Sequence, residues 1–369
     1  MRSVVLSIFD DIGNPHYGGG GATVVQQIAT RLAKNYRVTV YCGSYAGSPP
    51  AQIRDGVRYV FLPVGWAGPR GGQLLFQLLL PLVAVVRRPD LWIESLTPPF
   101  STSLLPLLSP APVIGLVQML SAADMARKYR LPFTLVERWG LGLYRHFIVL
   151  NETDRDAIRR WNPAATCELI PNGATRPPIA ERSFGSGEHI LFLGRIDVRQ
   201  KGLDLLVAAI VADPPPLPLV IAGGGTAREE RRLRELVRPV SQHVRIAGRV
   251  CGAEKEALLR DCAFVVVPSR YETFCLSALE AMTYGKPVVC FDLPQLEWIS
   301  ADCAVRVPPY DVRALGAAIG SLSRQPEQRG ALGRRGYAFS RQYDWDVIGE
   351  RYRSLVSSML DGHRPSRGG

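Results

Sequence analysis

The sequence predicts an α/β fold built from two doubly wound domains, each around a parallel sheet. Short runs rich in apolar and β-branched residues alternate with segments of helix length, the pattern of βαβ units. A first series of runs comprises residues 2–9, 36–42, 57–63, 91–96, 112–118, 146–151 and 167–173. A second series comprises residues 189–195, 217–225, 243–250, 263–269 and 286–292. A length of 369 residues also favours two cores over one.

The boundary between the predicted domains lies in a segment rich in Pro, Gly and Ser. This segment, residues 172–189, lacks a periodic apolar pattern. We therefore expect an N-terminal domain at residues 1–178 and a C-terminal domain at residues 179–344. Ligands of open parallel sheets bind beyond the carboxyl ends of the strands, so the site is expected in the cleft between the two sheets.

The charge balance is basic and the cysteines are scattered. A formal net charge of +11 favours anionic partners such as nucleotides or phospholipid headgroups. No nucleic-acid-binding motif accompanies the charge, so no nucleic acid partner is expected. The seven cysteines form no CxxC pair and indicate neither a metal site nor a disulfide framework. We expect buried thiols in a cytoplasmic protein. The oligomeric state is not predicted.

Three apolar or basic segments bear on localisation. Residues 1–11 turn acidic after a short apolar stretch, so we expect a buried strand rather than a signal peptide. The most apolar run, residues 74–86, contains Pro81 and is too short to cross a bilayer. We interpret it as a core helix, with a membrane-facing surface as the alternative. Basic residues among Leu, Phe and Trp at 124–146 suggest, as an alternative to a free cytoplasmic protein, peripheral contact with an anionic membrane at its inner face.

A glycine-rich loop, Gly18 to Gly21, follows the first predicted strand and precedes a helix expected to begin near Ala22. Glycine lets backbone N–H groups approach a ligand, and a helix N-terminus favours an anion. The spacing matches neither GxGxxG nor a Walker loop, so a plain structural turn is the alternative.

Two cations follow the first strand of the second series. Arg195 lies just beyond this strand, and Lys201 comes six residues later, before a helix expected to begin at about Gly202. Both are therefore expected at the carboxyl edge of the sheet, facing the cleft. The alternative is a solvated loop that carries charge.

Two glutamates flank the start of another predicted helix. Residues 263–269 form a buried strand, and residues 275–285 form a helix that Gly285 ends. Glu272 then lies in the loop before the helix and Glu280 about two turns into it. The first N–H groups of the helix are expected to be free for a phosphate, and the two carboxylates suit sugar hydroxyls. These N–H groups belong to Phe274, Cys275 and Leu276. The alternative is a structural acid at Glu280 and a surface turn residue at Glu272.

These motifs together resemble a known family. "SRYETFCLSALEAMTYGKPVV" resembles the signature of the large retaining GT-B glycosyltransferase family (glycosyl transferases group 1, family 4), in which two glutamates flank seven residues. "GRIDVRQKG" resembles its Arg…Lys–Gly diphosphate motif, and "LVIAGGG" and "VRIAGRV" resemble two strand–loop elements. "IPNGA" and "GGGGATVVQQIATRLAK" resemble its Asn–Gly stretch and its first glycine loop. The motifs occur in the family's order over nearly the whole chain, most weakly at residues 50–145.

The resemblance implies a GT-B fold and a nucleotide-diphosphate sugar as donor, most simply a UDP- or GDP-sugar, with no further cofactor. Arg195 and Lys201 would neutralise the leaving diphosphate, Glu272 would bind the donor sugar, and Glu280 the ribose. The remaining donor residues would be the backbone at Arg249 and Val250, which meets the base, and Gly19 and Gly20. Transfer would retain the anomeric configuration through a front-face, oxocarbenium-like step. No metal would be needed, because the cations and the helix dipole take over its charge role. The terminal helix, residues 345–369, would pack on the N-terminal domain.

The acceptor is expected to bind the first domain, where the motifs are weakest. The family usually has a histidine after the strand at 112–118, and this chain has Gln118 there, which cannot titrate. Asp124 and His16 are polar candidates nearby in the chain, with a surface acid and a loop histidine as the alternatives. Trp66 lies in a glycine-rich segment, residues 65–73, that is either a lid over the acceptor or a plain exposed loop.

The function that these observations predict is retaining hexosyl transfer to an acceptor such as a glycan, a lipid-linked sugar or a small metabolite. The alternative is a catalytically silent nucleotide-sugar-binding or scaffold protein of the same fold, which Gln118 favours. An NAD-type oxidoreductase is ranked last, because no GxGxxG with a ribose-binding acid follows the first strand.

Overall fold

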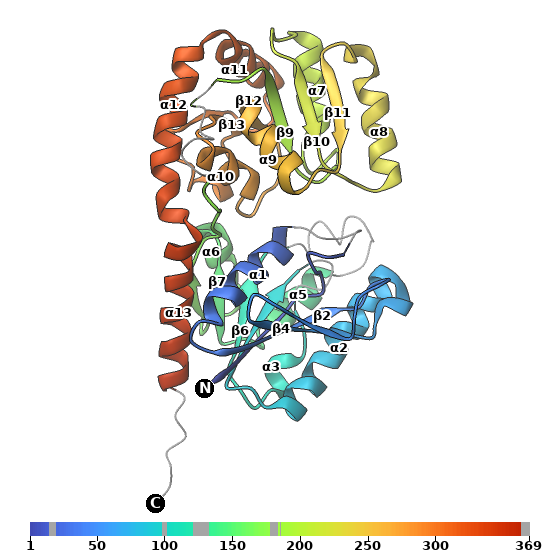
Figure 1. Cartoon of the computed structure of the whole chain (residues 1–369), viewed down its shortest axis with the longest axis vertical. Helices are drawn as coiled ribbons and strands as arrows, with labels where there is room; N and C mark the ends of the chain where they lie inside the picture. The colour runs from blue at the N-terminus through green and yellow to red at the C-terminus, as the bar shows by residue number, and fades with distance from the viewer. Residues whose placement is uncertain (15–19, 98–101, 121–132, 178–183, 185, 363–369) are drawn as a thin grey trace, which may run out of the picture. The chain divides into compact units, whose positions relative to one another are not determined.

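A computed structural model of the chain describes residues 1–14, 20–97, 102–120, 133–177, 184 and 186–362 (Figure 1). Two compact units emerge from the contacts: unit 1 is Met1–Asn172 with Trp345–Gly369, and unit 2 is Gly173–Asp344. The boundary falls at 172/173 rather than at 178/179. The reason is that the backbone N–H of Ala174 donates to the carbonyl oxygen of Tyr343 at 3.0 Å, which ties this segment to unit 2.

Unit 2 contains a six-stranded sheet in the order β11-β10-β9-β12-β13-β14, in which every neighbouring pair is parallel. Its strands are β9 (His189–Leu193), β10 (Leu219–Ala222), β11 (Val244–Gly248), β12 (Cys262–Val267), β13 (Val288–Phe291) and β14 (Ala304–Val307). The chain winds outward from β9 in one direction and from β12 in the other. The switch point of this doubly wound sheet therefore lies between β9 and β12.

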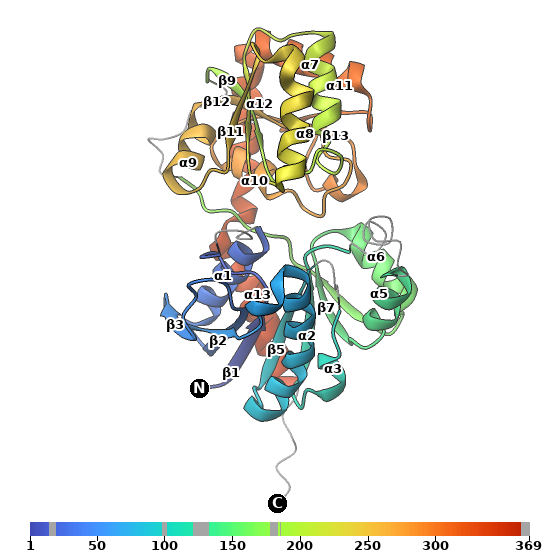
Figure 2. The same cartoon turned by 90° about the vertical axis from the view of Figure 1, so that its right-hand side faces the viewer.

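Helices cover the unit-2 sheet. They are α7 (Leu203–Ala212), α8 (Ala227–Val237), α9 (Gly252–Asp261), α10 (Leu276–Thr283), α11 (Val312–Arg324) and α12 (Pro326–Phe339), with short helices η3 (Arg238–Val240), η4 (Pro294–Leu296) and η5 (Ser340–Tyr343). Helix α7 contacts α8 and α11, and α10 contacts α12 (Figure 2). Every residue of β12 is buried, as expected for a parallel strand covered on both faces.

Unit 1 contains an eight-stranded sheet in the order β3-β4-β2-β1-β5-β6-β7-β8. Its strands are β1 (Ser3–Ser7), β2 (Arg37–Gly43), β3 (Ala51–Arg54), β4 (Val57–Leu62), β5 (Leu91–Leu96), β6 (Val113–Val117), β7 (His146–Val149) and β8 (Thr166–Leu169). All pairs are parallel except β3 with β4. The order again reverses in the middle, here between β1 and β5. The predicted α/β fold with two doubly wound domains is confirmed.

The helices of unit 1 include the end of the described chain. They are α1 (Gly20–Leu32), η1 (Gly65–Ala67), α2 (Gly68–Arg87), α3 (Leu105–Leu108), α5 (Phe133–Leu141), α6 (Glu152–Trp161) and α13 (Trp345–Gly362). Helix α13 packs on α1 and β5, and Arg31 pairs with Asp346 at 3.0 Å (Figure 1). Trp345, Ile348 and Tyr352 of α13 are buried at intervals of three and four residues and form a packing stripe, while Leu355 is only partly buried.

The structure adds two strands that were not predicted and refines one helix. The edge strand β3 was not predicted, although the Asp-Gly turn at 55–56, with φ of 50° and 76°, is a typical hairpin signal. The four-residue strand β14 was also missed. The run at 74–86 lies within α2 and is core on one face only, because Leu78 and Leu82 are exposed while Leu80 is buried. Within the described residues, no helix is long and apolar enough to span a membrane.

Candidate functional site

Two loops that leave the sheet at the switch point of unit 2 touch each other. One follows β9 and ends at Gly202, and the other follows β12 from Pro268. Gly202 has a φ of 63°, and a Cβ built on it would lie 1.8 Å from the carbonyl oxygen of Pro268. Only glycine allows both this conformation and this approach. This close contact with the loop after β12 explains why a glycine must follow Lys201.

Lys201 and Glu272 form an ion pair between these two loops. Lys201 Nζ lies 2.6 Å from Glu272 Oε1, and the side chains are 17% and 10% exposed. The hydroxyl of Ser269 donates to the same carboxylate oxygen at 2.6 Å. Burying a carboxylate costs free energy unless it is paired and hydrogen-bonded. Lys201 and Ser269 supply these partners, and the ion pair therefore fixes both side chains. The structure thus brings together two residues that lie 71 positions apart in the chain.

A second set of bonds fixes the same two loops. Arg270 pairs with Asp204 through both guanidinium nitrogens, at 2.7 and 2.9 Å, and its backbone N–H donates to Gln200 at 2.9 Å. Arg195, by contrast, is exposed, and its Nη2 donates to the side chain of Gln200 at 2.8 Å. Of the two predicted cations at this edge of the unit-2 sheet, Lys201 is thus held in an ion pair and Arg195 is exposed.

The start of α10 supplies backbone donors beside this pair. Cys275, the residue before the helix, has a φ of 66°, a conformation that non-glycine residues rarely adopt. Among the described residues, no acceptor is found for the backbone N–H groups of Phe274, Cys275 and Leu276. Such free N–H groups attract anions. Backbone strain next to free donors is typical of functional sites.

The side chains of these same residues do not serve the site. Phe274 is buried and stacks on Trp298 at 4.4 Å, while the indole of Trp298 donates to the carbonyl oxygen of Phe274 at 2.7 Å. Burial raises the pKa of the Cys275 thiol to about 12, and the charge of Glu272 adds to the effect. The thiol is therefore protonated at neutral pH and is no nucleophile. These side chains anchor the turn, and only the backbone is available to a ligand.

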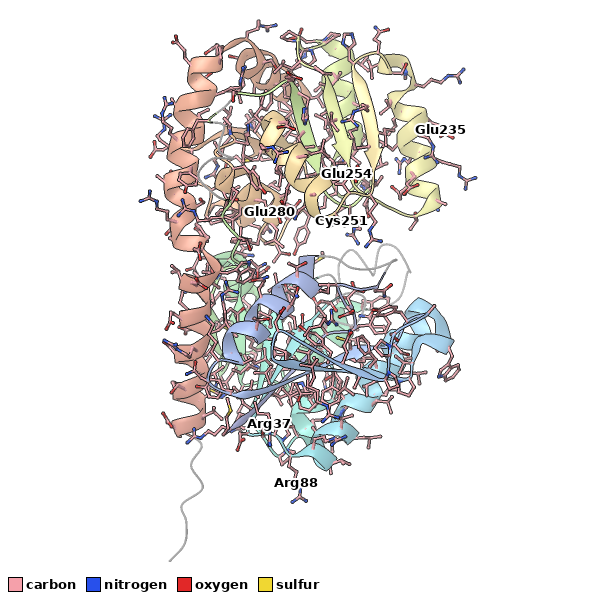
Figure 3. The ribbon with its side chains drawn as sticks, viewed as in Figure 1. Arg37, Arg88, Glu235, Cys251, Glu254 and Glu280 are labelled. Carbon is pink, nitrogen blue, oxygen red and sulfur yellow. The ribbon has the colours of Figure 1, made fainter. Side chains whose placement is uncertain are left out.

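Glu280 has a partner that the sequence did not reveal. Lys255 Nζ, from α9, lies 2.8 Å from Glu280 Oε1, and both side chains are half-buried. Figure 3 labels Glu280 and, near it in unit 2, Cys251 and Glu254 at the beginning of α9. Lys255 was not predicted as the partner of Glu280, because the pair joins two helices and no sequence spacing indicates such a contact. One oxygen of Glu280 remains without a hydrogen bond among the described contacts.

The predicted base-binding residues follow β11. Arg249 is exposed, and Val250 packs against the unit-2 core. The neighbouring Gly223 approaches the loop after β9 so closely that a Cβ on it would lie 1.7 Å from the carbonyl oxygen of Gly194. Its N–H donates to the carbonyl oxygen of Gly248 at 2.6 Å. The loops after β9, β10 and β11 are thus packed together at one edge of the sheet.

The structure describes only some of the site candidates in unit 1. Gly20 is the first residue of α1, two positions earlier than the predicted start of the helix, and Trp66 is 82% exposed in η1. Gln118 follows β6, and its Nε2 is buried without a hydrogen-bond partner among the described residues. Three further candidates lie outside the residues that the structure describes. These are Gly19, His16 and Asp124.

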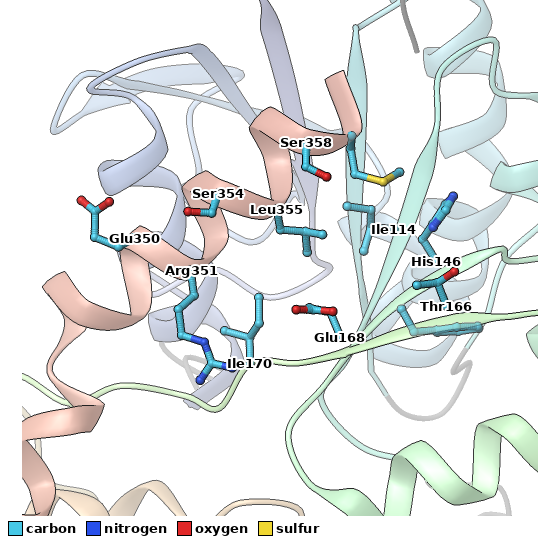
Figure 4. A pocket seen from close by; sticks show the side chains of 12 residues that line it. Ile114, His146, Thr166, Glu168, Ile170, Glu350, Arg351, Ser354, Leu355 and Ser358 are labelled. Carbon is cyan, nitrogen blue, oxygen red and sulfur yellow. The ribbon is translucent and has the colours of Figure 1, made fainter. Parts of the chain in front are cut away.

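A cavity of about 570 Å³ in unit 1 contains none of the predicted residues. It lies between α13 and the strands β6, β7 and β8, with His146 and Glu168 on one side and Arg351 on the other (Figure 4). In the part of the chain that the structure describes, no three His, Cys, Asp or Glu side chains are grouped so that they could hold a metal ion. The chemistry predicted from the sequence is therefore concentrated at the carboxyl edge of the unit-2 sheet.

Comparisons with known proteins match both units. The family model described as "Glycosyl transferases group 1" matches residues 187–325, and the one described as "Glycosyltransferase Family 4" matches residues 18–175. A phosphatidyl-myo-inositol mannosyltransferase of Mycolicibacterium smegmatis is 30% identical over 207 residues, which are 52% of this chain and 53% of the relative. The chain spans about half the length of the curated relatives it matches.

Solved structures resemble the chain over almost its full length. Sucrose-phosphate synthase from Thermosynechococcus elongatus superposes with a TM-score of 0.81 at 22% identity, covering 98% of this chain and all of the other. Anabaena Alr3699/HepE, solved in complex with UDP and glucose, superposes with a TM-score of 0.77 at 15% identity, covering 97% and 100%. At these identities the likeness establishes the fold, which is GT-B.

Proposed function

Because the chain belongs to the glycosyl transferases of group 1 and has the GT-B fold, we propose that it transfers a sugar from a nucleotide-diphosphate sugar to an acceptor. The observation that carries the proposal is the Lys201–Glu272 pair at the switch point of unit 2, beside the free N–H groups that precede α10. Ligands of doubly wound sheets bind at such a switch point. A cation and backbone donors suit a diphosphate, and a carboxylate suits a sugar.

The cations stabilise the leaving group. The reaction breaks the bond between the anomeric carbon and a diphosphate oxygen, and forms a bond from that carbon to an acceptor hydroxyl oxygen. The hydroxyl proton passes to the departing diphosphate, where negative charge develops. Lys201, Arg195 and the N–H groups at the start of α10 stabilise this charge. Glu272 binds the donor sugar hydroxyls, and Glu280 binds the ribose. We propose that the anomeric configuration is retained and that this donor set acts without a metal ion.

The proposed donor and acceptor follow from the names of the similar proteins. The mannosyltransferase relative is named for a phosphatidyl-myo-inositol acceptor, and the Anabaena neighbour is solved with UDP and glucose. For this chain we propose a UDP- or GDP-hexose donor and a sugar-containing or lipid-linked acceptor. All seven cysteines are free thiols, in agreement with a reducing compartment, and we propose a cytoplasmic location.

One observation favours a second candidate, a catalytically silent nucleotide-sugar-binding protein. Gln118 stands where the family usually has a histidine, and its buried amide nitrogen lacks a partner among the described residues. The two candidates differ in turnover rather than in donor binding.

The experiment that separates them measures nucleoside diphosphate and product formation from UDP- and GDP-hexoses, with glycan and lipid-linked acceptors. The variants Lys201→Ala and Glu272→Gln are compared with Arg199→Ala, an exposed cation of the same loop. We expect the wild type and Arg199→Ala to release nucleoside diphosphate and to form product. Lys201→Ala and Glu272→Gln should form product at least 100-fold more slowly. Donor binding by the wild type without any release in the presence of the full acceptor set would favour the silent protein.

A further inference from the structure

Helix α2 exposes a continuous apolar stripe. Leu74, Leu78, Leu82 and Val86 follow one another at intervals of four residues and are 45 to 77% exposed. The opposite face, which includes Leu80, is buried in the unit-1 core. Because apolar residues occupy both faces, α2 satisfies its core contacts and still presents an apolar surface to solvent. Single exposed apolar residues are common, but a contiguous stripe of this kind indicates an interaction surface.

The stripe continues onto two neighbouring helices. Twenty large apolar side chains are exposed among the described residues, and eleven of them belong to α2, α3 and α5 or directly precede α3. Besides the stripe, they are Val85 of α2, Leu104, Leu107 and Leu108 at α3, and Leu135, Val136 and Trp139 of α5. A groove of about 300 Å³ runs between the three helices and is lined mainly by these side chains. We call this set of residues the α2–α3–α5 face.

The charges near the face are mainly basic, although α5 also carries one acid, Glu137. The sequence from residue 56 to residue 123 contains two acids, Asp90 and Glu94. Glu94 is buried, and Asp90 accepts hydrogen bonds from the backbone and the hydroxyl of Ser3, at 2.6 and 2.9 Å. Arg87 and Arg88 at the end of α2 are exposed, and Figure 3 shows Arg88 extending away from the helix. The face therefore combines aliphatic side chains with a positive rim.

We propose that the α2–α3–α5 face docks onto an anionic lipid bilayer, with its leucines among the acyl chains and its arginines at the headgroups. Leucine and valine in a stripe, a tryptophan, and flanking arginines are the composition of a surface that lies in the plane of a membrane interface. A protein partner is less well matched. Protein interfaces are enriched in aromatic residues, Met and Arg, and they typically contain about one hydrogen bond per 100–200 Å². The eleven exposed side chains of the face offer one donor, the Trp139 indole. The apolar area also extends beyond the groove, so a single bound lipid chain would leave Leu107, Leu135 and Val86 uncovered.

This assignment extends the membrane contact that the sequence suggested at residues 124–146, because Leu135, Val136 and Trp139 of that segment belong to the face. Most of the basic residues of that segment lie outside the described part of the chain. The long apolar run at 74–86 is the segment that the structure brings to the surface. The proposal does not depend on glycosyl transfer, because it concerns a face of unit 1 and a ligand without nucleotide.

The test is co-sedimentation of the full chain with vesicles of phosphatidylcholine alone, or of phosphatidylcholine with phosphatidylglycerol, at low and at high salt. The face variant carries Leu78→Gln, Leu82→Gln and Val86→Gln, because glutamine keeps the helix propensity. The matched control replaces three exposed apolar residues elsewhere, as Ile53→Gln, Val211→Gln and Val347→Gln. Melting temperatures verify that both triple variants are folded. Sedimentation velocity of the wild type without lipid measures its oligomeric state.

We expect the wild type and the control to bind anionic vesicles at low salt, and the face variant to bind at least tenfold more weakly. High salt and the pair Arg87→Gln with Arg88→Gln should each weaken binding to anionic vesicles. Binding by the face variant equal to that of the wild type would overturn the proposal, as would no binding by the wild type. A wild-type dimer that the face variant dissociates would assign the face to a second copy of the chain instead.

Discussion

Lys201 Nζ donates to Glu272 Oε1 over 2.6 Å, and this bond joins the loop after β9 to the loop after β12. The two residues therefore form one unit at the switch point of the second sheet. The carboxylate also accepts from Ser269. Before a ligand binds, the charge of Lys201 is compensated by Glu272, and a bound diphosphate would share the same ammonium group.

Replacement of Lys201 by alanine tests its role in the leaving-group step. If its charge acts mainly where the diphosphate departs, Lys201→Ala should lower kcat by about 100- to 1000-fold and change the KM for the donor much less. Steady-state kinetics with a saturating acceptor would measure both constants. Arg199→Ala, an exposed neighbour, should leave them within a factor of two or three of the wild type. An unchanged kcat in Lys201→Ala contradicts the assignment.

The contact between the two loops makes Gly202 a stability determinant. Gly202→Ala forces a Cβ into a left-handed conformation and against the carbonyl oxygen of Pro268. Gly252 is a matched control, since its φ is 52° and a Cβ added there would meet no atom within 4 Å. We expect Gly252→Ala to cost about 1 kcal/mol and Gly202→Ala about 3 kcal/mol of unfolding free energy. Urea unfolding measures the two free energies. If Gly202→Ala cost no more than Gly252→Ala, the loop after β12 would have moved away from residue 202 without penalty.

The pair of Lys255 and Glu280 predicts a residue that tunes ribose recognition. Lys255 holds one carboxylate oxygen of Glu280, which leaves the other for a ribose hydroxyl. Lys255→Met should raise the KM for the nucleotide sugar about tenfold with little change in kcat, and reduce the preference for ribose over 2′-deoxyribose nucleotides. Glu256→Gln, on the same helix and exposed, serves as the control. Unaltered discrimination between the two nucleotides in Lys255→Met would rule out this role.

A buried acid in unit 1 predicts a pH dependence of stability. Burial raises the pKa of Glu94 from 4.5 to about 7, against the hydrogen bonds from Tyr144 and Ser103. The folded state therefore binds this proton more tightly than the unfolded state between pH 4.5 and 7. Its contribution to stability is present below pH 4.5 and is lost as pH rises to 7, by about 3 kcal/mol.

Glu94→Gln removes this titration. The melting temperature of the variant, relative to the wild type, should therefore rise from pH 5 to pH 8. A difference that does not change with pH would mean that the carboxyl group does not titrate in this range.

The sequence predicted the features that depend on short-range pattern. The two series of strands, the loop positions of Lys201 and Glu272, and the helix that follows them all come from runs and turn residues that are local in the chain. Strand β3 escaped because it is four residues long and pairs at an edge, where alternation has little length to show itself.

Features that depend on tertiary neighbours could not be predicted. The partner of Glu280 is on another helix, and the buried side chains of Phe274 and Cys275 are set by contacts with Trp298 and the unit-2 core. The exposed face of α2 could not be predicted for a different reason. Its sequence is apolar on almost every side, so no polar stripe marked the face that meets solvent.

The central claim is that Arg195, Lys201 and the start of α10 bind a diphosphate. The most direct measurement is the melting temperature of the wild type with UDP, GDP, ADP or TDP, each compared with its nucleoside. A diphosphate at 100 times its Kd should add about 2.7 kcal/mol of stability, the nucleoside much less, and the double variant Arg195→Ala with Lys201→Ala should lose most of the shift. No shift with any diphosphate, or an equal shift in the double variant, would contradict the account.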